Sequence, residues 1–249
     1  MRDYRLRTRR HRTFAQQRES AEVGVARIPP PSDVAYTPVT VGEMPAQWVA
    51  APGASAACAI LYLHGGAYAL GSLNTHRPLV TALARAARVR VLALDYRLAL
   101  EHPFPAALDD SLAAYCGLLA DGIDPARLAL VGDSAGGGHA VAFLVALRDT
   151  GDPLPAACVC LSPWVDLALA GESLQTKAKR DVMVTPDLLH RSAAAYLAGA
   201  EPRTPLASPL DADLFGLPPL LIQVGTDDVL LDDAVRLAVL ARAAGCRSR

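Results

Sequence analysis

The sequence predicts an α/β fold, built on a mostly parallel sheet with helices on both faces. Near-continuous apolar runs of strand length alternate with longer runs of helical periodicity, which is typical of a parallel sheet buried on both sides. The chain has 249 residues, enough for one such domain with room for a modest lid. Because 52% of the residues are hydrophobic, a large core can form.

The alternation can be followed in order along the chain. Strands are predicted at residues 59–63, 89–94, 128–131, 157–161 and 220–224, and helices at 78–87, 106–119, 135–147 and 232–244. Right-handed crossovers place the carboxyl ends of parallel strands at one edge of the sheet, where ligands bind.

Two segments interrupt the alternation and are predicted to form a helical cap over that edge. Residues 1–35 form an N-terminal arm and cap segment that ends in a run of prolines, Pro29 to Pro31. The main domain spans residues 36–249 and contains a cap insertion at about 165–205, with a helical stretch at 186–198. The amphipathic, Ala/Leu-rich character of both segments fits a cap over an apolar pocket.

Composition excludes several classes of partner. The chain has 24 Lys and Arg against 25 Asp and Glu, a net charge of −1, which does not favour nucleic acid. No apolar run reaches the roughly 18 residues of a membrane helix, so we expect no stable membrane insertion. Arg2, Arg5, Arg7, Arg9, Arg10 and Arg12 are not followed by an apolar segment, which indicates a solvated arm rather than a signal peptide. With five cysteines in no disulfide or zinc pattern, we expect free thiols and a cytoplasmic protein.

The strongest chemical signal is a glycine-flanked serine between the strand at 128–131 and the helix at 135–147. The segment Gly132-Asp133-Ser134-Ala135-Gly136 has the G-x-S-x-G pattern of a nucleophile elbow, in the strand–turn–helix context that such an elbow requires. Glycines two residues before and after the serine allow a tight turn that exposes the hydroxyl. The alternative is an ordinary glycine-rich turn between a strand and a helix.

A second glycine-rich loop, His64-Gly65-Gly66-Ala67-Tyr68, directly follows the strand at 59–63. Such a loop can bring backbone N–H groups to the oxyanion of a tetrahedral intermediate, together with the amide of Ala135. We interpret His64 as a structural residue that fixes the loop, since it lies at the strand end ahead of the glycines.

These segments resemble the hormone-sensitive-lipase-like esterases, also called the GDXG family. The resemblance includes Ile60–His76, the GDSAGG segment, and further motifs at 95–106, 161–164 and 225–230, all in the order and spacing of that family. It implies an α/β-hydrolase fold with 36–249 as catalytic domain, and a carboxylic-ester hydrolase for short- to medium-chain acyl esters. The implied substrate is a small-molecule ester that forms an acyl-enzyme, with no metal or organic cofactor.

The resemblance also implies the residue roles. Ser134 is the nucleophile and Asp228 orients the base. The oxyanion hole comes from Gly65, Gly66, Ala67 and Ala135, with Ala67 where family members often have a third glycine. Asp227 is the alternative acid, and both aspartates could instead belong to a helix N-cap cluster with Asp232 and Asp233. Substrate-pocket candidates are Tyr68, Leu70, Trp164 and Met183, each of which could equally be core.

The triad histidine is missing from its expected place. The fold's order is Ser, then Asp, then His, but all six histidines precede Asp228. We therefore expect that the chain is truncated at its C-terminus, lacks the last strand and has impaired activity. The strand at 220–224 would then be an exposed apolar edge. Neither His139 nor His190 would be held by Asp228 in the known arrangement.

Other interpretations stay open at this point. One is a non-catalytic, ligand-binding homologue on the same scaffold, and another is a peptidase. Homodimerisation is also left open. The charged residues beside the motifs, namely Asp95, Arg97, Glu101 and Asp133, are expected to hold their own turns by local hydrogen bonds and ion pairs.

Overall fold

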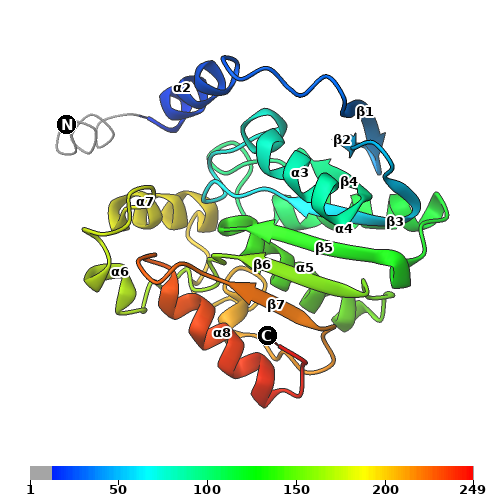
Figure 1. Cartoon of the computed structure of the whole chain (residues 1–249). Coiled ribbons are helices and arrows are strands. Elements are labelled where there is room, and N and C mark those ends of the chain that lie inside the picture. Colours follow the sequence, from blue (N-terminus) through cyan, green and yellow to red (C-terminus); the bar gives the residue numbers. More distant parts are fainter. Residues whose placement is uncertain (1–12, 249) are drawn as a thin grey trace.

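The computed structural model describes residues 13–248, so the basic segment Arg2 to Arg12 lies outside the described residues. One seven-stranded sheet runs through the molecule in the order β1-β2-β4-β3-β5-β6-β7 (Figure 1). Its strands are β1 Ala35–Val41, β2 Met44–Ala50, β3 Ser55–Leu63, β4 Val89–Leu94, β5 Leu128–Asp133, β6 Ala157–Leu161 and β7 Leu220–Gln223. Strands β3 to β7 pair in parallel, whereas β2 pairs antiparallel with β1 and with β4. The predicted fold class is confirmed.

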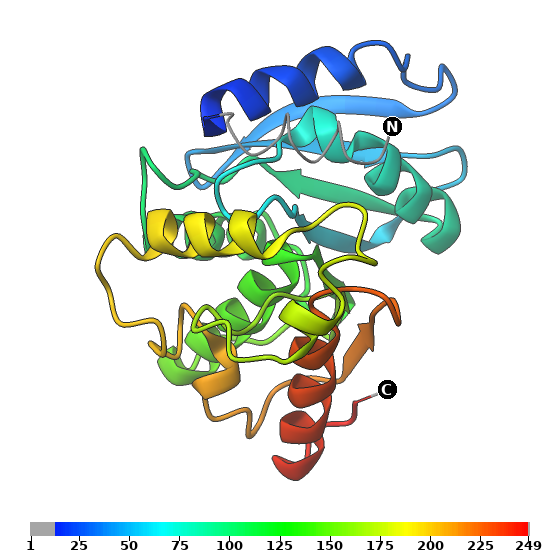
Figure 2. The ribbon, with the colours of Figure 1, turned by 90° about the vertical axis from the view of Figure 1, so that its left-hand side faces the viewer.

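Helices lie between the strands, before the first strand and after the last. They are α2 Phe14–Val25, α3 Leu73–Ala87, α4 Ala106–Ala120, α5 Ala135–Thr150, α6 Ser173–Thr176, α7 Pro186–Leu197 and α8 Leu231–Ala243, with short 3-10 turns at Pro125–Arg127 and Pro209–Asp211. Both α6 and α7 lie in the predicted insertion. Figure 2 shows α2 and α7 running across the same end of the molecule.

Alternation along β3 divides the core into two layers. Ile60 and Tyr62 point to the face that α3 covers, where they join Val80 and Ala84 of that helix. Their neighbours in sequence belong to the larger cluster on the opposite face, which includes residues of α4, α5 and α8. This two-residue period, buried on both sides, explains why the strands are apolar throughout.

The strands that sequence patterns missed lie before β3. Strands β1 and β2 form a hairpin in which Val41 pairs with Met44. The two loop residues, Gly42 and Glu43, both have positive φ (53° and 70°), as in a type I′ turn. Helix α2 lies within the segment 1–35 that was predicted to contribute to the cap, but it was not located there, because Phe14 is its only buried residue and no apolar period marks it.

Helix α3 begins at Leu73 rather than at the predicted residue 78. Ser72 and Thr75 form a capping box in front of it, so the helix starts earlier than the apolar pattern indicates. None of the helices in residues 13–248 is both long and apolar enough to cross a membrane.

Strand β7 is the edge of the sheet in the described part of the chain. On its outer side only Leu220 is paired, through its N–H to the carbonyl of Arg247 (2.9 Å) and a parallel bridge to Ser248. Leu221 is 46% exposed. The predicted apolar edge is therefore present, although the C-terminal residues cover its first position.

Helix α8 offers a matched test of this packing. Leu237 is fully buried in the core cluster, whereas Leu240 of the same helix is 39% exposed. We expect Leu237→Ala to lower the free energy of unfolding by about 2–5 kcal/mol, since it leaves a cavity. Leu240→Ala should lower it by less than about 1 kcal/mol. Urea denaturation of both variants measures the difference, and equal losses would contradict this packing of α8.

Candidate active site

Ser134 occupies a strained bend between β5 and α5. Its backbone angles are φ 51° and ψ −121°, outside the regions that a serine normally adopts. Its N–H donates to the carbonyl of Leu161 (2.8 Å), and its own carbonyl accepts from the N–H of Trp164 (2.9 Å). The half-buried side chain, in contrast, makes no hydrogen bond to any described residue. The backbone is thus fixed while the hydroxyl stays free.

The bend requires glycine at two positions. A Cβ atom on Gly132 would collide with the carbonyl of Gly136. A Cβ atom on Gly136 would collide with the carbonyls of Leu63 and His64, at the end of β3. The absence of side chains therefore brings the serine turn into direct contact with the loop after β3.

That loop presents backbone N–H groups without partners. The amides of Gly66 and Ala67 donate no hydrogen bond to any described residue, and neither does the amide of Ala135 at the start of α5. Unpaired amides are uncommon in folded proteins and mark places where a ligand or water binds. Gly65 is different, since its N–H donates to the Asp133 carboxylate (2.9 Å), so it can shape the loop but not supply a donor.

Asp133 joins the two loops. It accepts from the N–H of Gly65 and from the hydroxyl of Tyr62, and His76 Nε2 lies 3.5 Å from its other carboxylate oxygen. Burial alone would raise the pKa of Asp133, but His76, Tyr62 and the Gly65 amide outweigh it and hold the pKa below its usual value. The expectation that Asp133 bonds locally is wrong, because these partners lie on other elements.

Three histidines form a stacked column with Tyr96 beneath the loop. His64 stacks on Tyr96 (4.3 Å between ring centroids) and on His76 (5.2 Å), and His139 stacks on the other side of Tyr96 (5.2 Å). Burial lowers the pKa of His64 to about 4 and that of His139 to about 3, so both are neutral near pH 7.

His64 has the position expected of a structural residue. Its Nδ1 donates to the carbonyl of Gly65 (2.7 Å), and its Nε2 is buried without a partner among the described residues. The Tyr96 hydroxyl donates to the His64 carbonyl.

None of the described histidines contacts Ser134 through a hydrogen bond. His139 is buried and bonded to Ser111 (2.7 Å), while His102 and His190 are exposed. His11 lies outside the described residues. Within residues 13–248, no imidazole is therefore hydrogen-bonded to the serine.

Four aspartates follow β7: Asp227 and Asp228 in the turn before α8, and Asp232 and Asp233 in its first turn. Asp228 accepts from the N–H of Leu230 (2.9 Å) in the turn that leads into α8 and is half-buried. Asp227 is exposed and pairs with Arg180 of the insertion (2.9 Å). Asp232 and Asp233 do not form the N-cap cluster considered above, since α8 has no side-chain cap.

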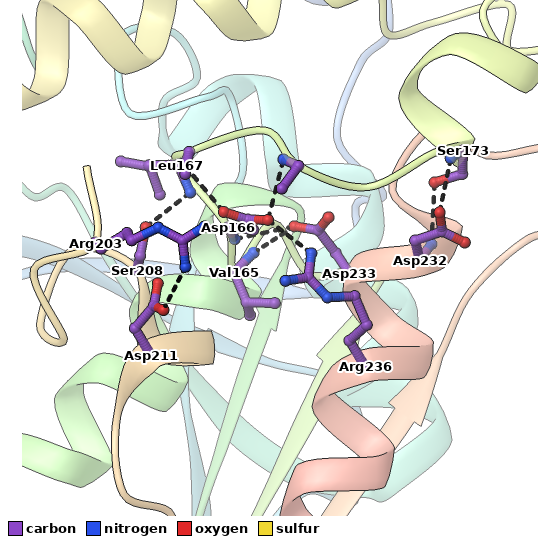
Figure 3. Close-up of polar contacts among 12 residues, drawn as sticks. Val165, Asp166, Leu167, Ser173, Arg203, Ser208, Asp211, Asp232, Asp233 and Arg236 are labelled. Atoms are coloured by element: carbon purple, nitrogen blue, oxygen red, sulfur yellow. Dashed lines mark hydrogen bonds and ion pairs between the residues drawn. The ribbon is translucent and has the colours of Figure 1, made fainter.

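Asp232 and Asp233 instead hold the insertion against α8 (Figure 3). Asp233 accepts from the amides of Val165 (2.9 Å) and Asp166 (3.0 Å), and Asp232 accepts from the amide of Ser173 (2.7 Å). Arg236 of α8 donates to Asp166 (2.7 Å). Burial, and secondarily the charge of Asp166, raises the pKa of Asp233 to about 7 against the pull of its hydrogen bonds and Arg236.

The four pocket candidates do not share one environment. Tyr68 and Trp164 are buried in the core, their ring centroids 6.0 Å apart, and Leu70 packs against the same cluster. Met183 is 74% exposed. A hollow of about 250 Å³ lies elsewhere, between the residues after α2 and helix α3, and is lined by none of the four. Their role in substrate binding stays a prediction.

Sequence patterns did not reveal the residues of α2 and α7 that contact the glycine-rich loop after β3 and the residue that follows it. Arg18 of α2 donates to the carbonyls of Ala69 (2.8 Å) and Ala99 (2.9 Å), and Tyr196 of α7 stacks on Tyr68 (3.8 Å between centroids). Arg18 also pairs with Glu101, which was expected to bond only within its own turn. These partners are far apart in sequence, so no local motif marks them.

Comparison with known proteins agrees with this geometry. Residues 60–249 match a family model described as the alpha/beta hydrolase fold. An acetyl-hydrolase of Streptomyces hygroscopicus is 55% identical over 216 residues, which are 87% of this chain and 71% of that protein. An esterase of Acinetobacter venetianus is 42% identical over 74% of this chain and 61% of its own length.

A crystal structure of an esterase from the bacterial hormone-sensitive lipase family superimposes with a TM-score of 0.93 at 52% identity, covering 96% of this chain and 80% of that one. A hormone-sensitive lipase from a metagenome library gives a TM-score of 0.93 at 42% identity, with the same coverage. The chain therefore belongs to the α/β-hydrolase family. The predicted resemblance to the hormone-sensitive-lipase-like esterases is confirmed.

The anchoring of the insertion should depend on pH through Asp233. Its pKa is about 7 in the folded chain against 3.8 for a free carboxyl, so the folded state binds more protons than the unfolded state between these values. The contribution of Asp233 to stability is thus full below about pH 4 and falls as the pH rises to 7. In Asp233→Asn an amide oxygen still accepts both N–H groups but does not titrate.

Urea denaturation from pH 4 to 7.5 tests this pH dependence. The unfolding free energy of the wild type, relative to Asp233→Asn, should fall with rising pH by up to roughly 1.4 kcal/mol per unit. A difference that stays constant across the range would mean that Asp233 is ionised in the folded chain.

Proposed function

We propose that the chain is a serine carboxylic-ester hydrolase acting on small esters with short- to medium-chain acyl groups. The observation that carries the proposal is the free hydroxyl of Ser134, on a strained bend packed against a loop with unpaired amides. The names of the similar proteins, acetyl-hydrolase and esterase, support the same reaction class.

In the proposed reaction, Ser134 Oγ attacks the ester carbonyl carbon and forms a tetrahedral intermediate. Its negative oxygen accepts hydrogen bonds from the amides of Ala135, Gly66 and Ala67, which need no reorientation because the surrounding backbone is fixed. The C–O bond to the alcohol then breaks, and the alcohol leaves with the proton that the serine hydroxyl has lost, which gives an acyl-enzyme. Water then attacks the acyl carbonyl and releases the acid, and a proton returns to the serine oxygen. Asp228 is the residue that would orient the base.

Proton transfer is the step that the described residues do not provide. Since no histidine among them is bonded to Ser134, we propose that this chain works far more slowly than a complete triad, by roughly 10⁴–10⁶-fold. What remains is catalysis by the oxyanion amides and by substrate binding. A small external base such as imidazole should therefore increase the rate.

The reactivity of Ser134 can be tested by covalent labelling, which detects a nucleophile even when turnover is slow. After incubation with a fluorophosphonate, with and without imidazole, mass spectrometry of the digested protein should show the adduct on the peptide that contains Ser134. We expect imidazole to speed adduct formation by at least about tenfold. Hydrolysis of p-nitrophenyl butyrate should follow the same dependence.

Two serine variants provide the comparison. Ser134→Ala should abolish the adduct and the imidazole-dependent hydrolysis, while Ser55→Ala, an exposed serine at the start of β3, should behave as the wild type. Equal labelling and equal hydrolysis by wild type and Ser134→Ala would remove Ser134 from the mechanism and refute the proposed function.

A further inference from the structure

The guanidinium of Arg18 contacts the backbone at two places, just after the loop at residues 64–68 and in the segment that follows β4. Its Nε donates to the Ala69 carbonyl (2.8 Å), and its Nη2 donates to the Ala99 carbonyl (2.9 Å). Both Nη atoms also bind the Glu101 carboxylate (2.9 and 3.0 Å). A planar group with fixed donors holds several acceptors in one geometry, which a lysine cannot do.

The turn that Arg18 contacts is strained. Ala67 and Tyr68 both have positive φ, 54° and 58°, a conformation that costs a residue with a Cβ atom about 1 kcal/mol or more. The amides of Ala69 and Leu70 close the turn on the carbonyl of Gly66 (3.1 and 2.7 Å). Such a conformation persists only when its surroundings hold it, and it sets the direction of the Gly66 and Ala67 amides.

Several groups of the main domain also hold this turn. The Ala99 amide donates to the Tyr68 carbonyl (2.7 Å), and Asp133 binds the Gly65 amide. Ala99 makes both contacts: its carbonyl accepts from Arg18, and its amide donates to the Tyr68 carbonyl. Arg18 therefore ties the turn to the segment that supports it, rather than to a distant surface.

Arg18 reaches this turn from helix α2, which also contacts α7 and the start of α3. Of α2, only Phe14 is buried, and the Arg191 guanidinium lies over its ring at 5.4 Å. Glu22 accepts from Ser72 and Asn74 at the start of α3. The α2 helix thus contacts α7, the turn at residues 66–70 and the start of α3.

We propose that Arg18 is a positioning residue for the oxyanion hole and couples the docking of α2 to the direction of the Gly66 and Ala67 amides. This inference rests on the proposed function. When Arg18 is bound, the turn keeps the conformation in which these amides are free to donate. When α2 leaves, the Ala69 and Ala99 carbonyls lose their shared donor and the turn relaxes. The N-terminal segment is then part of the catalytic apparatus although it carries no reacting group.

The experiment compares Arg18→Gln, Arg18→Lys and a matched control, Arg27→Gln, in the full chain. Arg27 is exposed and follows α2. In Arg18→Gln we expect imidazole-dependent hydrolysis of p-nitrophenyl butyrate to fall by about 10- to 100-fold in kcat with little change in KM, since the amides act in the transition state. Arg18→Lys should recover only part of this loss, and Arg27→Gln should match the wild type.

Hydrogen exchange provides a readout that does not need catalysis. The amides of Ala69 and Leu70 should exchange about tenfold faster in Arg18→Gln, with unchanged exchange in the core of β5. Unchanged exchange at Ala69 and Leu70 would overturn the inference. Faster exchange at these amides with wild-type kcat would also overturn it, since the clamp would then be structural only.

The two proposals fail in distinguishable ways. If Ser134→Ala reacts as fast as the wild type, the proposed function fails whatever Arg18 does. If Ser134→Ala is inactive and Arg18→Gln matches the wild type in kcat, the proposed function stands and only the role of Arg18 is refuted.

Discussion

The architecture of the site depends on one close backbone approach. The turn that carries Ser134 lies against the end of β3, because Gly136 has no side chain to separate it from the carbonyls of Leu63 and His64. The Asp133 carboxylate spans the same junction and holds the Gly65 amide. The turn that carries Ser134 and the loop that carries the Gly66 and Ala67 amides follow different strands, so the spacing between them is set by this contact rather than by either segment alone.

Around this junction the chain arranges support in layers. The histidine–tyrosine column lies beneath the loop, and Tyr196 and Arg18 hold its outer side from α7 and α2. The insertion that contains α7 is in turn fixed to α8 by Asp166, Asp233 and Arg236. A bend with unfavourable backbone angles, such as that at Ser134, persists only when the surrounding structure holds it, and these contacts are part of that surrounding structure.

The sheet from β3 onward could be predicted from sequence, because each of its strands is apolar on both faces and is followed by a helix. The elbow and the glycine loop could also be located. Their glycines are required because a side chain there would collide with the backbone, and this requirement is visible in the sequence as a glycine pattern. The β1–β2 hairpin was missed, and α2 was not located within the predicted cap segment 1–35, since neither carries a strong apolar period. Helix α3 starts at Leu73 rather than at residue 78 because Ser72 caps it, and the apolar pattern gives no information about a polar cap.

The supporting contacts of the site could not be predicted, for a different reason. Arg18 can form its hydrogen bonds to Ala69, Ala99 and Glu101 only after the sheet has folded, because these residues are far from it in sequence. The same holds for the hydrogen bond between Asp133 and Tyr62. Asp232 and Asp233 resembled helix caps in sequence, yet they bind the insertion instead. Long-range polar contacts of this kind leave no period or spacing in the sequence.

The stacked histidines give the molecule a particular response to acid. His64 and His139 are neutral in the folded chain down to about pH 4, whereas an imidazole in an unfolded chain takes up a proton near pH 6.5. Between about pH 4 and 6.5 the unfolded chain therefore binds more protons than the folded chain, and the free energy of unfolding falls as the pH falls. Because both rings are fully buried, the folded chain disfavours the charged imidazole, and weak acid therefore lowers the free energy of unfolding through one residue directly after β3 and one residue of α5.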